Sequence, residues 1–344
     1  MRSLKSIVGS VASRFSGLRP TPKPTPELES RLTSGAVLSE DPSLRPGDFF
    51  MPAQRIEPLL RAGDMHILDV KKCASGVAGA QIVYLDFPTE KLTLKAKWKE
   101  AKHGGSALNN EPRKEVAAFE IQKWFLEPDE YVVPPTVCRA IALDRYKDEV
   151  RETRPTFDGT ECAFGVLAFW LDNVEDMPKG FDAQRFEADL PYRDTMANMN
   201  LLTYLIDHRD TRPANFVFSK DPKRPRALSI DNGLAFSGLV NPRVLVLHEW
   251  RHLIVPKLPR AKVERLRALT RKDLDKLSVV AQLERTDKML SSVEPGPVLA
   301  DSEHGVRCEG NILQLGLRPG EIDGIEERIK HLFAKVEAGK LELY

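Results

Sequence analysis

The sequence predicts an α+β protein in which two lobes enclose a cleft. The N-terminal half alternates β-prone stretches with turns and contains one helical stretch, whereas the half beyond residue 172 is mainly helical in pattern. An apolar content of 42% in 344 residues is enough to fill the core of one large two-lobed domain. We therefore expect a tail and linker over residues 1–44, an N-terminal lobe over 45–172 and a C-terminal lobe over 173–344.

The first 26 residues are basic, contain no acid and carry apolar residues at helical spacing. Such a segment suits an organelle transit peptide, a peripheral membrane anchor or an unstructured tail, and the pattern does not decide among them. Four prolines alternate between residues 20 and 26, so we expect residues 18–30 to be an extended linker. No apolar run reaches the length of about 18 to 20 residues that a membrane-spanning helix needs.

Charge and cysteine content exclude several classes of protein. The 51 basic and 50 acidic residues give a net charge of +1, which provides no global field to recruit nucleic acid, and we expect no such partner. The four cysteines are widely spaced and form no C-x-x-C pair, which argues against a disulfide framework or a zinc knuckle. This usage favours a reducing compartment, and we expect a cytoplasmic protein.

The elements of the predicted N-terminal lobe follow from hydrophobic periodicity. Three strands are expected between residues 65 and 98, in MHILDV, AQIVYLDF and KLTLKAKW. A helix should follow over residues 111–126, and the short aromatic-rich run at 162–171 predicts a buried strand. These elements would form an antiparallel sheet with one helix.

Three helices are predicted in the C-terminal lobe. The nearly all-apolar stretch MANMNLLTYLI occupies residues 196–206. A second helix is expected over residues 270–284, because it opens with a T-x-x-D start signal. A third is expected over residues 322–336, where apolar residues recur on one face.

A polar segment, HRDTRPANFVF over residues 208–218, directly follows the apolar helix. Its Asp210 and Asn215 stand close enough in the sequence for one loop to carry both a carboxylate and a carboxamide. The segment resembles the catalytic loop of the protein-kinase-like superfamily, H-R-D-x-K/R-P-x-N. This resemblance implies a bilobal kinase fold that moves the γ-phosphoryl group of ATP to a hydroxyl, with Asp210 as the catalytic carboxylate.

A second acidic element begins at Asp231, in the run DNGLAF at the end of an apolar strand. It resembles the metal-binding element of type II phosphatidylinositol 4-kinases and of the secretory kinases related to Golgi casein kinase. Hard cations take oxygen ligands, and the resemblance implies that Asn215 and Asp231 hold Mg²⁺, with Mn²⁺ as an alternative. Taken alone, each segment also suits an ordinary turn, because Asp-Asn-Gly is a common hairpin sequence.

The superfamily places a phosphate-binding lysine on a strand and a glutamate on the next helix, because a fixed anion must orient the lysine. Lys97 and Glu115 stand in such places, and the resemblance implies that both are catalytic and that Lys97 contacts ATP. Lys95 is the alternative, since strand alternation puts both lysines on one face. Lys97 is preferred by the family's hydrophobic-Lys-Pro pattern, although Trp98 stands where proline is usual.

Two further segments complete the expected nucleotide site. The loop CASGVAGA over residues 73–80 resembles the phosphate-covering loop of the type II lipid kinases, which would make Ser75, Gly76 and Gly79 nucleotide contacts. An ordinary hairpin fits this loop equally well. The segment LDNV after the aromatic strand falls where the adenine-binding hinge belongs, and the resemblance implies contacts from Asp172 and Asn173.

Three questions stay open at the level of sequence. The acceptor hydroxyl belongs to a protein, a lipid or a small molecule, and a protein is slightly favoured because the cysteine cluster of the type II lipid kinases is missing here. A pseudokinase that binds nucleotide and serves as a scaffold is the alternative function. A remote alternative is a zinc peptidase, because His248 and His252 satisfy H-E-x-x-H, although Pro256 should end a helix there.

Overall fold

The computed structural model of the chain describes most of residues 53–344 and a two-residue strand before them. Within these ranges the protein is an α+β fold with antiparallel sheets and seven α-helices. Several residues singled out in the sequence lie outside the described ranges, namely Ser75, Gly76, Asn173 and His248, as does most of the basic N-terminal segment. The described residues are 38–39, 53–73, 79–107, 110–146, 154–172, 174–177, 180–210, 213–221, 225–236, 249–300 and 304–344.

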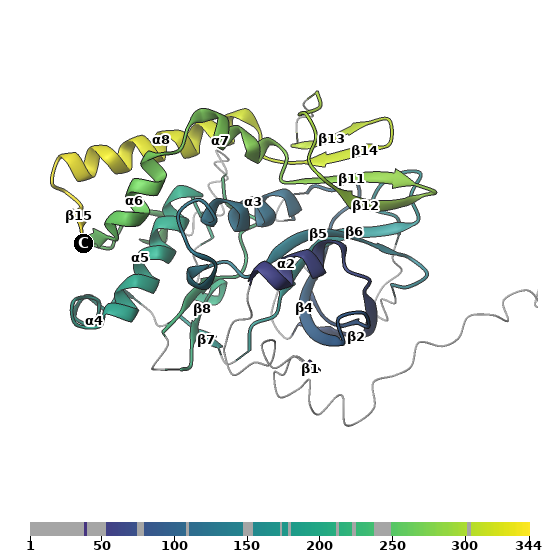
Figure 1. The fold of residues 1–344 in the computed structure, drawn as a ribbon, viewed down its shortest axis with the longest axis horizontal. Helices are drawn as coiled ribbons and strands as arrows, with labels where there is room; N and C mark the ends of the chain where they lie inside the picture. Colours follow the sequence, from purple (N-terminus) through teal and green to yellow (C-terminus); the bar gives the residue numbers. More distant parts are fainter. Residues whose placement is uncertain are drawn as a thin grey trace, which may run out of the picture.

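A six-stranded antiparallel sheet, here called the large sheet, organises the N-terminal half (Figure 1). Its order is β2-β3-β4-β6-β5, and the short β1 pairs with the start of β4. The three strands expected between residues 65 and 98 are β2, β3 and β4, and the expected aromatic strand is β6. The strands are β1 Leu38–Ser39, β2 His66–Lys72, β3 Gln81–Phe87, β4 Leu92–Glu100, β5 Thr136–Ala142 and β6 Cys162–Phe169.

The two faces of the large sheet pack against different helices. On one face, even-numbered β4 residues such as Leu94 and Trp98 share a core with α2, Ala53–Ala62. Successive strand side chains alternate, so the odd-numbered β4 residues point to the opposite face. The expected helix α3, Pro112–Gln122, lies on that opposite side, where its Phe119 belongs to a second core that extends through the C-terminal half.

A long apolar helix and a small sheet begin the C-terminal half. Helix α5 covers the expected stretch at 196–206 and starts earlier, because the Asp189 side chain accepts a hydrogen bond from Tyr192 N and caps the helix. Strand β7 precedes α5 in the sequence, and β8 and β9 follow it. The three strands pair as an antiparallel sheet in the order β7-β8-β9. The bounds are β7 Val174–Asp176, α4 Ala183–Ala188, α5 Leu190–Leu205, β8 Phe216–Ser219 and β9 Ala227–Ser229.

The prediction of one helix over residues 270–284 is correct at its start and wrong beyond Asp275. Thr270 does form the capping box that its T-x-x-D signal predicts, but α7 ends at Asp275 and a 3₁₀ turn ends at Ser278. The chain then enters a four-stranded antiparallel sheet, here called the C-terminal sheet, in the order β12-β11-β14-β13. Its strands are β11 Ala281–Thr286, β12 Met289–Val293, β13 Val306–Glu309 and β14 Ile312–Leu315. The C-terminal half is therefore less helical than the sequence indicated.

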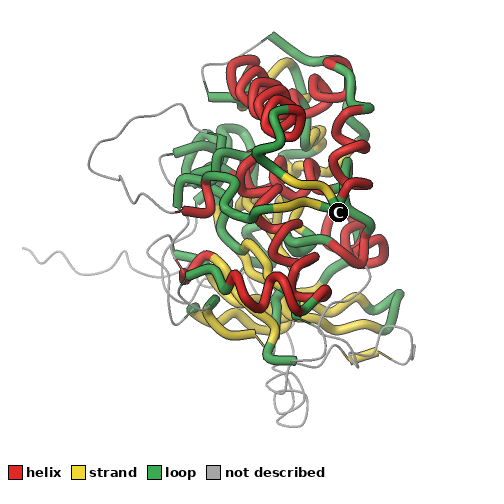
Figure 2. The backbone as a smooth tube through the Cα atoms, turned by 90° about the vertical axis from the view of Figure 1, so that its left-hand side faces the viewer, coloured by secondary structure: helices red, strands yellow, loops and turns green. Residues whose placement is uncertain are grey.

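The C-terminal sheet and the last helix close the fold. Strand β12 contacts β5 and α2, so the C-terminal sheet packs beside the large sheet. The third expected helix is α8, Pro319–Glu337, which runs along the upper edge in Figure 1, while Figure 2 shows strands mainly toward the lower edge. Helix α6, Arg260–Arg267, and the parallel pair of β10, Lys257–Leu258, with β15, Glu342–Leu343, complete the described fold. None of the described helices is long and apolar enough to cross a bilayer.

Candidate functional site

A hairpin of two short strands brings Asn215 and Asp231 together. Asn215 directly precedes β8 and Asp231 follows β9 by two residues, and these strands pair antiparallel. The adjacency is fixed by a backbone hydrogen bond from Ile230 N to Asn215 O at 3.0 Å. Asn215 Nδ2 also donates to Asp210 O at 2.6 Å, so the segment around Asp210 is held against the same end of the hairpin.

The loop before Asp210 is fixed by Asp207 and His208. Asp207 adopts a left-handed φ of 47° just after α5, and its carboxylate binds Arg209 at 2.9 Å and also Arg251. His208 is fully buried and lies against the Phe216 ring. Burial lowers the pKa of His208, so the ring is uncharged near neutral pH. The ion pairs of Asp207 and the burial of His208 therefore hold in place the residues that directly precede Asp210.

Within the described residues, Lys99 lies between two acids. Lys99 Nζ donates to Glu115 Oε1 at 3.1 Å and to Asp231 Oδ1 at 3.2 Å. The Lys99 and Glu115 side chains are 4% and 5% exposed, whereas Asp231 is 37% exposed. Glu115 Oε2 accepts a further hydrogen bond from Asn232 N at 3.0 Å. The large sheet, α3 and the segment after β9 thus meet at one ammonium group.

Proton affinities around Lys99 follow from this arrangement. Burial alone would lower the pKa of Lys99, but Glu115 and Asp231 raise it above its usual value. Burial alone would raise the pKa of Asp231, but the charges of Lys97 and Lys99 hold it well below its usual range. Lys99 is therefore cationic and Asp231 anionic across the physiological range.

The lysine that pairs with Glu115 is thus neither Lys97 nor Lys95, and the expected pairing is corrected to Lys99. Lys97 Nζ instead donates to Ile230 O at 2.6 Å, one residue before Asp231. Lys95 Nζ binds Asp172 at 2.8 Å. All three lysines point to the same face of β4, as strand alternation requires.

The sequence contained a signal for Lys99. Residues 95, 97 and 99 share the period-two register, so the alternation that admitted Lys95 and Lys97 admits Lys99 equally. Lys99 also follows the aromatic residue Trp98, which suits a hydrophobic-Lys pattern better than the alanine before Lys97. Only the position of α3 along the strand separates the three candidates.

Little of the expected phosphate-covering loop lies within the described residues. Its end, Gly79, has a φ of 71°, a left-handed conformation that glycine adopts without strain. Beside it, Cys73 N donates to Ala80 O at 3.4 Å, which closes the loop between β2 and β3. Of the expected hinge residues, Asp172 is described and is paired with Lys95.

The oxygen atoms of Asn215 and Asp231 suit a hard cation. The hydrogen bond from Asn215 Nδ2 to Asp210 O leaves the Asn215 carboxamide oxygen as an acceptor. The partly exposed Asp231 carboxylate keeps its negative charge in the same place. Mg²⁺ is bound in proteins through one or two carboxylates or amide oxygens, with phosphates and water supplying the rest, and this donor set fits it. The described residues contain no group of three histidines, cysteines or acids that would hold a metal on its own.

The histidine motif gains no support as a zinc site. Glu249–Arg251 is a single 3₁₀ turn, whereas the H-E-x-x-H arrangement needs an α-helix to bring its histidines onto one face. His252 is exposed, and its carbonyl accepts a hydrogen bond from Asn200 at 2.7 Å.

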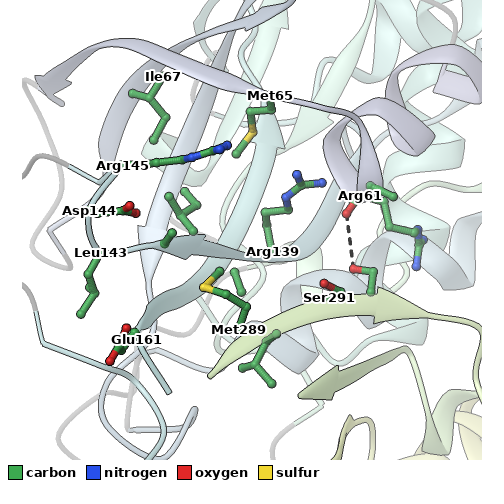
Figure 3. A pocket seen from close by; sticks show the side chains of 16 residues that line it. Arg61, Met65, Ile67, Arg139, Leu143, Asp144, Arg145, Glu161, Met289 and Ser291 are labelled. Carbon is green, nitrogen blue, oxygen red and sulfur yellow. Dashed lines mark hydrogen bonds between the residues drawn. The ribbon is translucent and has the colours of Figure 1, made fainter. Parts of the chain in front are cut away.

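The described residues also line a separate cavity, which Lys99 does not border. It measures about 910 Å³ and is bordered by the ends of α2, β2, β5 and β12 (Figure 3). Two of its arginines have structural roles: Arg139 donates to Gly63 O at 2.8 Å after α2, and Arg61 binds Glu57 at 2.5 Å. We therefore assign this cavity to the junction between the C-terminal sheet and the large sheet.

No protein-family model and no curated protein matches this chain.

Proposed function

We propose that this protein is a Mg²⁺-dependent phosphotransferase of bilobal protein-kinase-like fold, which moves the γ-phosphoryl group of ATP to a hydroxyl. The observation that carries the proposal is the contact of Lys99 with both Glu115 and Asp231. Asp231 is 132 residues from Lys99 in the sequence. Phosphoryl transfer uses such a combination of an oriented lysine and a metal-binding acid. In this proposal residues 45–172 and 173–344 form the two lobes.

Each residue has a distinct role in the proposed reaction. Lys99, oriented by Glu115, contacts the phosphates of ATP, and Asn215 with Asp231 holds Mg²⁺, which neutralises phosphate charge. Asp210 accepts the proton of the acceptor hydroxyl. The acceptor oxygen then forms a bond to the γ-phosphorus, and the bond from that phosphorus to the β,γ-bridging oxygen breaks, with ADP as the leaving group.

The kind of molecule that carries the acceptor hydroxyl is a separate proposal. We favour a protein hydroxyl over a phosphoinositide, because the chain lacks the cysteine cluster of the type II lipid kinases. The basic N-terminal segment is the candidate contact to a membrane surface if the acceptor is a lipid.

The experiment is phosphoryl transfer from labelled ATP, with Mg²⁺, to panels of proteins, phosphoinositides and small molecules. Asp231→Asn should abolish Mg²⁺-dependent nucleotide binding, because it removes a metal-binding charge. Asp210→Asn should retain nucleotide binding and lose transfer.

Nucleotide binding and phosphate transfer, measured together, separate the enzyme from a pseudokinase. A protein that binds Mg-ATP through Asp231 but transfers no phosphate to any acceptor or to water is a binding module. If the wild-type protein binds neither ATP nor another nucleotide, the proposal as a whole is refuted.

A further inference from the structure

The first turn of α3 contains three consecutive charged residues that are all buried. The side chains of Arg113, Lys114 and Glu115 are 2%, 1% and 5% exposed. Two cations in the first turn oppose the helix dipole, and the N-cap Glu111 makes no side-chain capping bond. Buried charges need partners, so the position of this helix depends on the acids that meet Arg113 and Lys114.

The main partner is Glu321 in the first turn of α8, more than 200 residues further along the chain. Arg113 Nη1 donates to Glu321 Oε2 at 2.5 Å, and Nη2 donates to Oε1 at 3.0 Å. This is a bidentate contact, which fixes orientation as well as distance. Lys114 binds Glu111 at 2.8 Å and lies 3.9 Å from Glu321, so both cations face the same acid.

The surroundings of Glu321 make it a rigid support. Its Oε2 also accepts a hydrogen bond from Arg318 N at 2.8 Å, which caps α8. Gly305, with a φ of 67°, leaves room for the guanidinium group: a Cβ there would lie 3.0 Å from Arg113 Cδ and 2.5 Å from Gly316 O. The loops before β13 and after β14 are thus shaped around the Arg113 side chain.

On its other side, the same helical turn presents Glu115 to Lys99. Because Glu115 is only two residues from Arg113 on one helix, a rotation of α3 that breaks one contact displaces the other. A buried ion pair stabilises a fold no better than a well-packed apolar pair, whereas a bidentate pair specifies one geometry. The Arg113–Glu321 pair is therefore better suited to orient α3 than to stabilise it.

We propose that Glu321 is a positioning residue, which acts through Arg113 to hold Glu115 against Lys99. The site is then incomplete without the C-terminal sheet and α8, since the segment 304–321 supplies this support. The importance for catalysis rests on the proposed function, but the positioning itself is a property of the free protein.

The test measures the reactivity of the Lys99 amine without nucleotide. Wild type and variants are treated with acetic anhydride, and acetylation of Lys99 is followed by peptide mass spectrometry. Glu321→Gln should accelerate Lys99 acetylation severalfold, because an amine that is only 4% exposed becomes accessible to the reagent when Glu115 moves away from it. Glu337→Gln, on the exposed end of the same helix, is the matched control and should leave the rate unchanged.

A second variant separates positioning from stability. Arg113→Met/Glu321→Leu removes both charges, and should regain the wild-type unfolding midpoint while Lys99 still reacts fast. If this variant is as stable as wild type and its Lys99 is acetylated at the wild-type rate, the pair has no positioning role and the proposal is wrong. Phosphoryl transfer is measured in a separate assay. If the wild-type protein transfers no phosphate, the proposed function is refuted. The acetylation rates of Lys99 still show whether Glu321 positions Glu115.

Discussion

The assignment of Lys99 makes a quantitative prediction that distinguishes it from Lys97. Lys99→Met keeps the length of the side chain and removes a charge that lies 3.1 and 3.2 Å from two carboxylates. Removing one preorganised electrostatic contact from a transition state costs about 10²–10³-fold in rate, which is about 2.7–4 kcal/mol. We expect kcat/KM for ATP to fall by that factor.

Lys97→Met is the matched control on the same strand face. Lys97 lies near Asp231 but donates its hydrogen bond to the carbonyl of Ile230, and a hydrogen bond of this kind contributes about 0.5–1.5 kcal/mol. Its rate should therefore stay within about tenfold of wild type. The assay is steady-state transfer with varied Mg-ATP, which separates kcat from KM.

Stability must be measured alongside, because Lys99→Met leaves Glu115 buried without its partner. Breaking a buried pair costs about 3–5 kcal/mol of unfolding free energy, which chemical denaturation would detect. The double variant Lys99→Met/Glu115→Gln removes both charges and should recover most of that stability without recovering the rate. A Lys97→Met variant that loses more than a hundredfold, beside an active Lys99→Met, would show that Lys97 is the phosphate-binding residue.

Two further predictions concern ionisable groups. In the folded protein, the charges of Lys97 and Lys99 outweigh burial and depress the pKa of Asp231. The ionised Asp231 carboxylate therefore contributes its full stability above about pH 4, which is the pKa of an aspartate in the unfolded chain. This stability is lost as the pH falls through the pKa of Asp231 in the folded protein. Asp231→Asn should therefore have a shallower acid limb in urea unfolding below about pH 4, and identical limbs would contradict the contact. Burial raises the pKa of the Cys138 thiol to about 12, whereas Cys308 on β13 is exposed. A thiol reagent near pH 8 should label Cys308 in the native protein and Cys138 only on unfolding, and equal rates would contradict their placement.

The elements that the sequence predicted are those whose signals are local. Strands β2 to β4 and β6 have alternating or continuously apolar patterns, and α3 and α8 have helical ones. The C-terminal sheet was missed because its pairing is non-local: Ala281 of β11 pairs with Leu315 of β14, and each strand is too short to dominate a window. The T-x-x-D signal at Thr270 correctly predicted the start of a helix but carries no information about its end.

The proximity of Asn215 to Asp231 was easier to predict than the lysine that contacts Glu115. Asp210, Asn215 and Asp231 lie in segments whose order and spacing are informative, and the structure brings Asn215 to Asp231 through one hairpin. The choice among Lys95, Lys97 and Lys99 depends instead on how far α3 lies along β4. That distance is set by contacts from α8 and the C-terminal sheet, which no local pattern contains.

The register of β4 links the core to this chemistry. A shift of one residue would turn Lys95, Lys97 and Lys99 to the other face of the large sheet, so the opposite face must fix the register. Trp98 does this: it is fully buried, its Nε1 donates to Tyr146 Oη at 3.1 Å, and Tyr146 Oη donates to Gln81 at 2.7 Å. Because an indole N–H has few alternative partners in a core, a slipped strand would leave it unsatisfied. The same tryptophan that stabilises the sheet therefore keeps the three lysines on the face that meets α3.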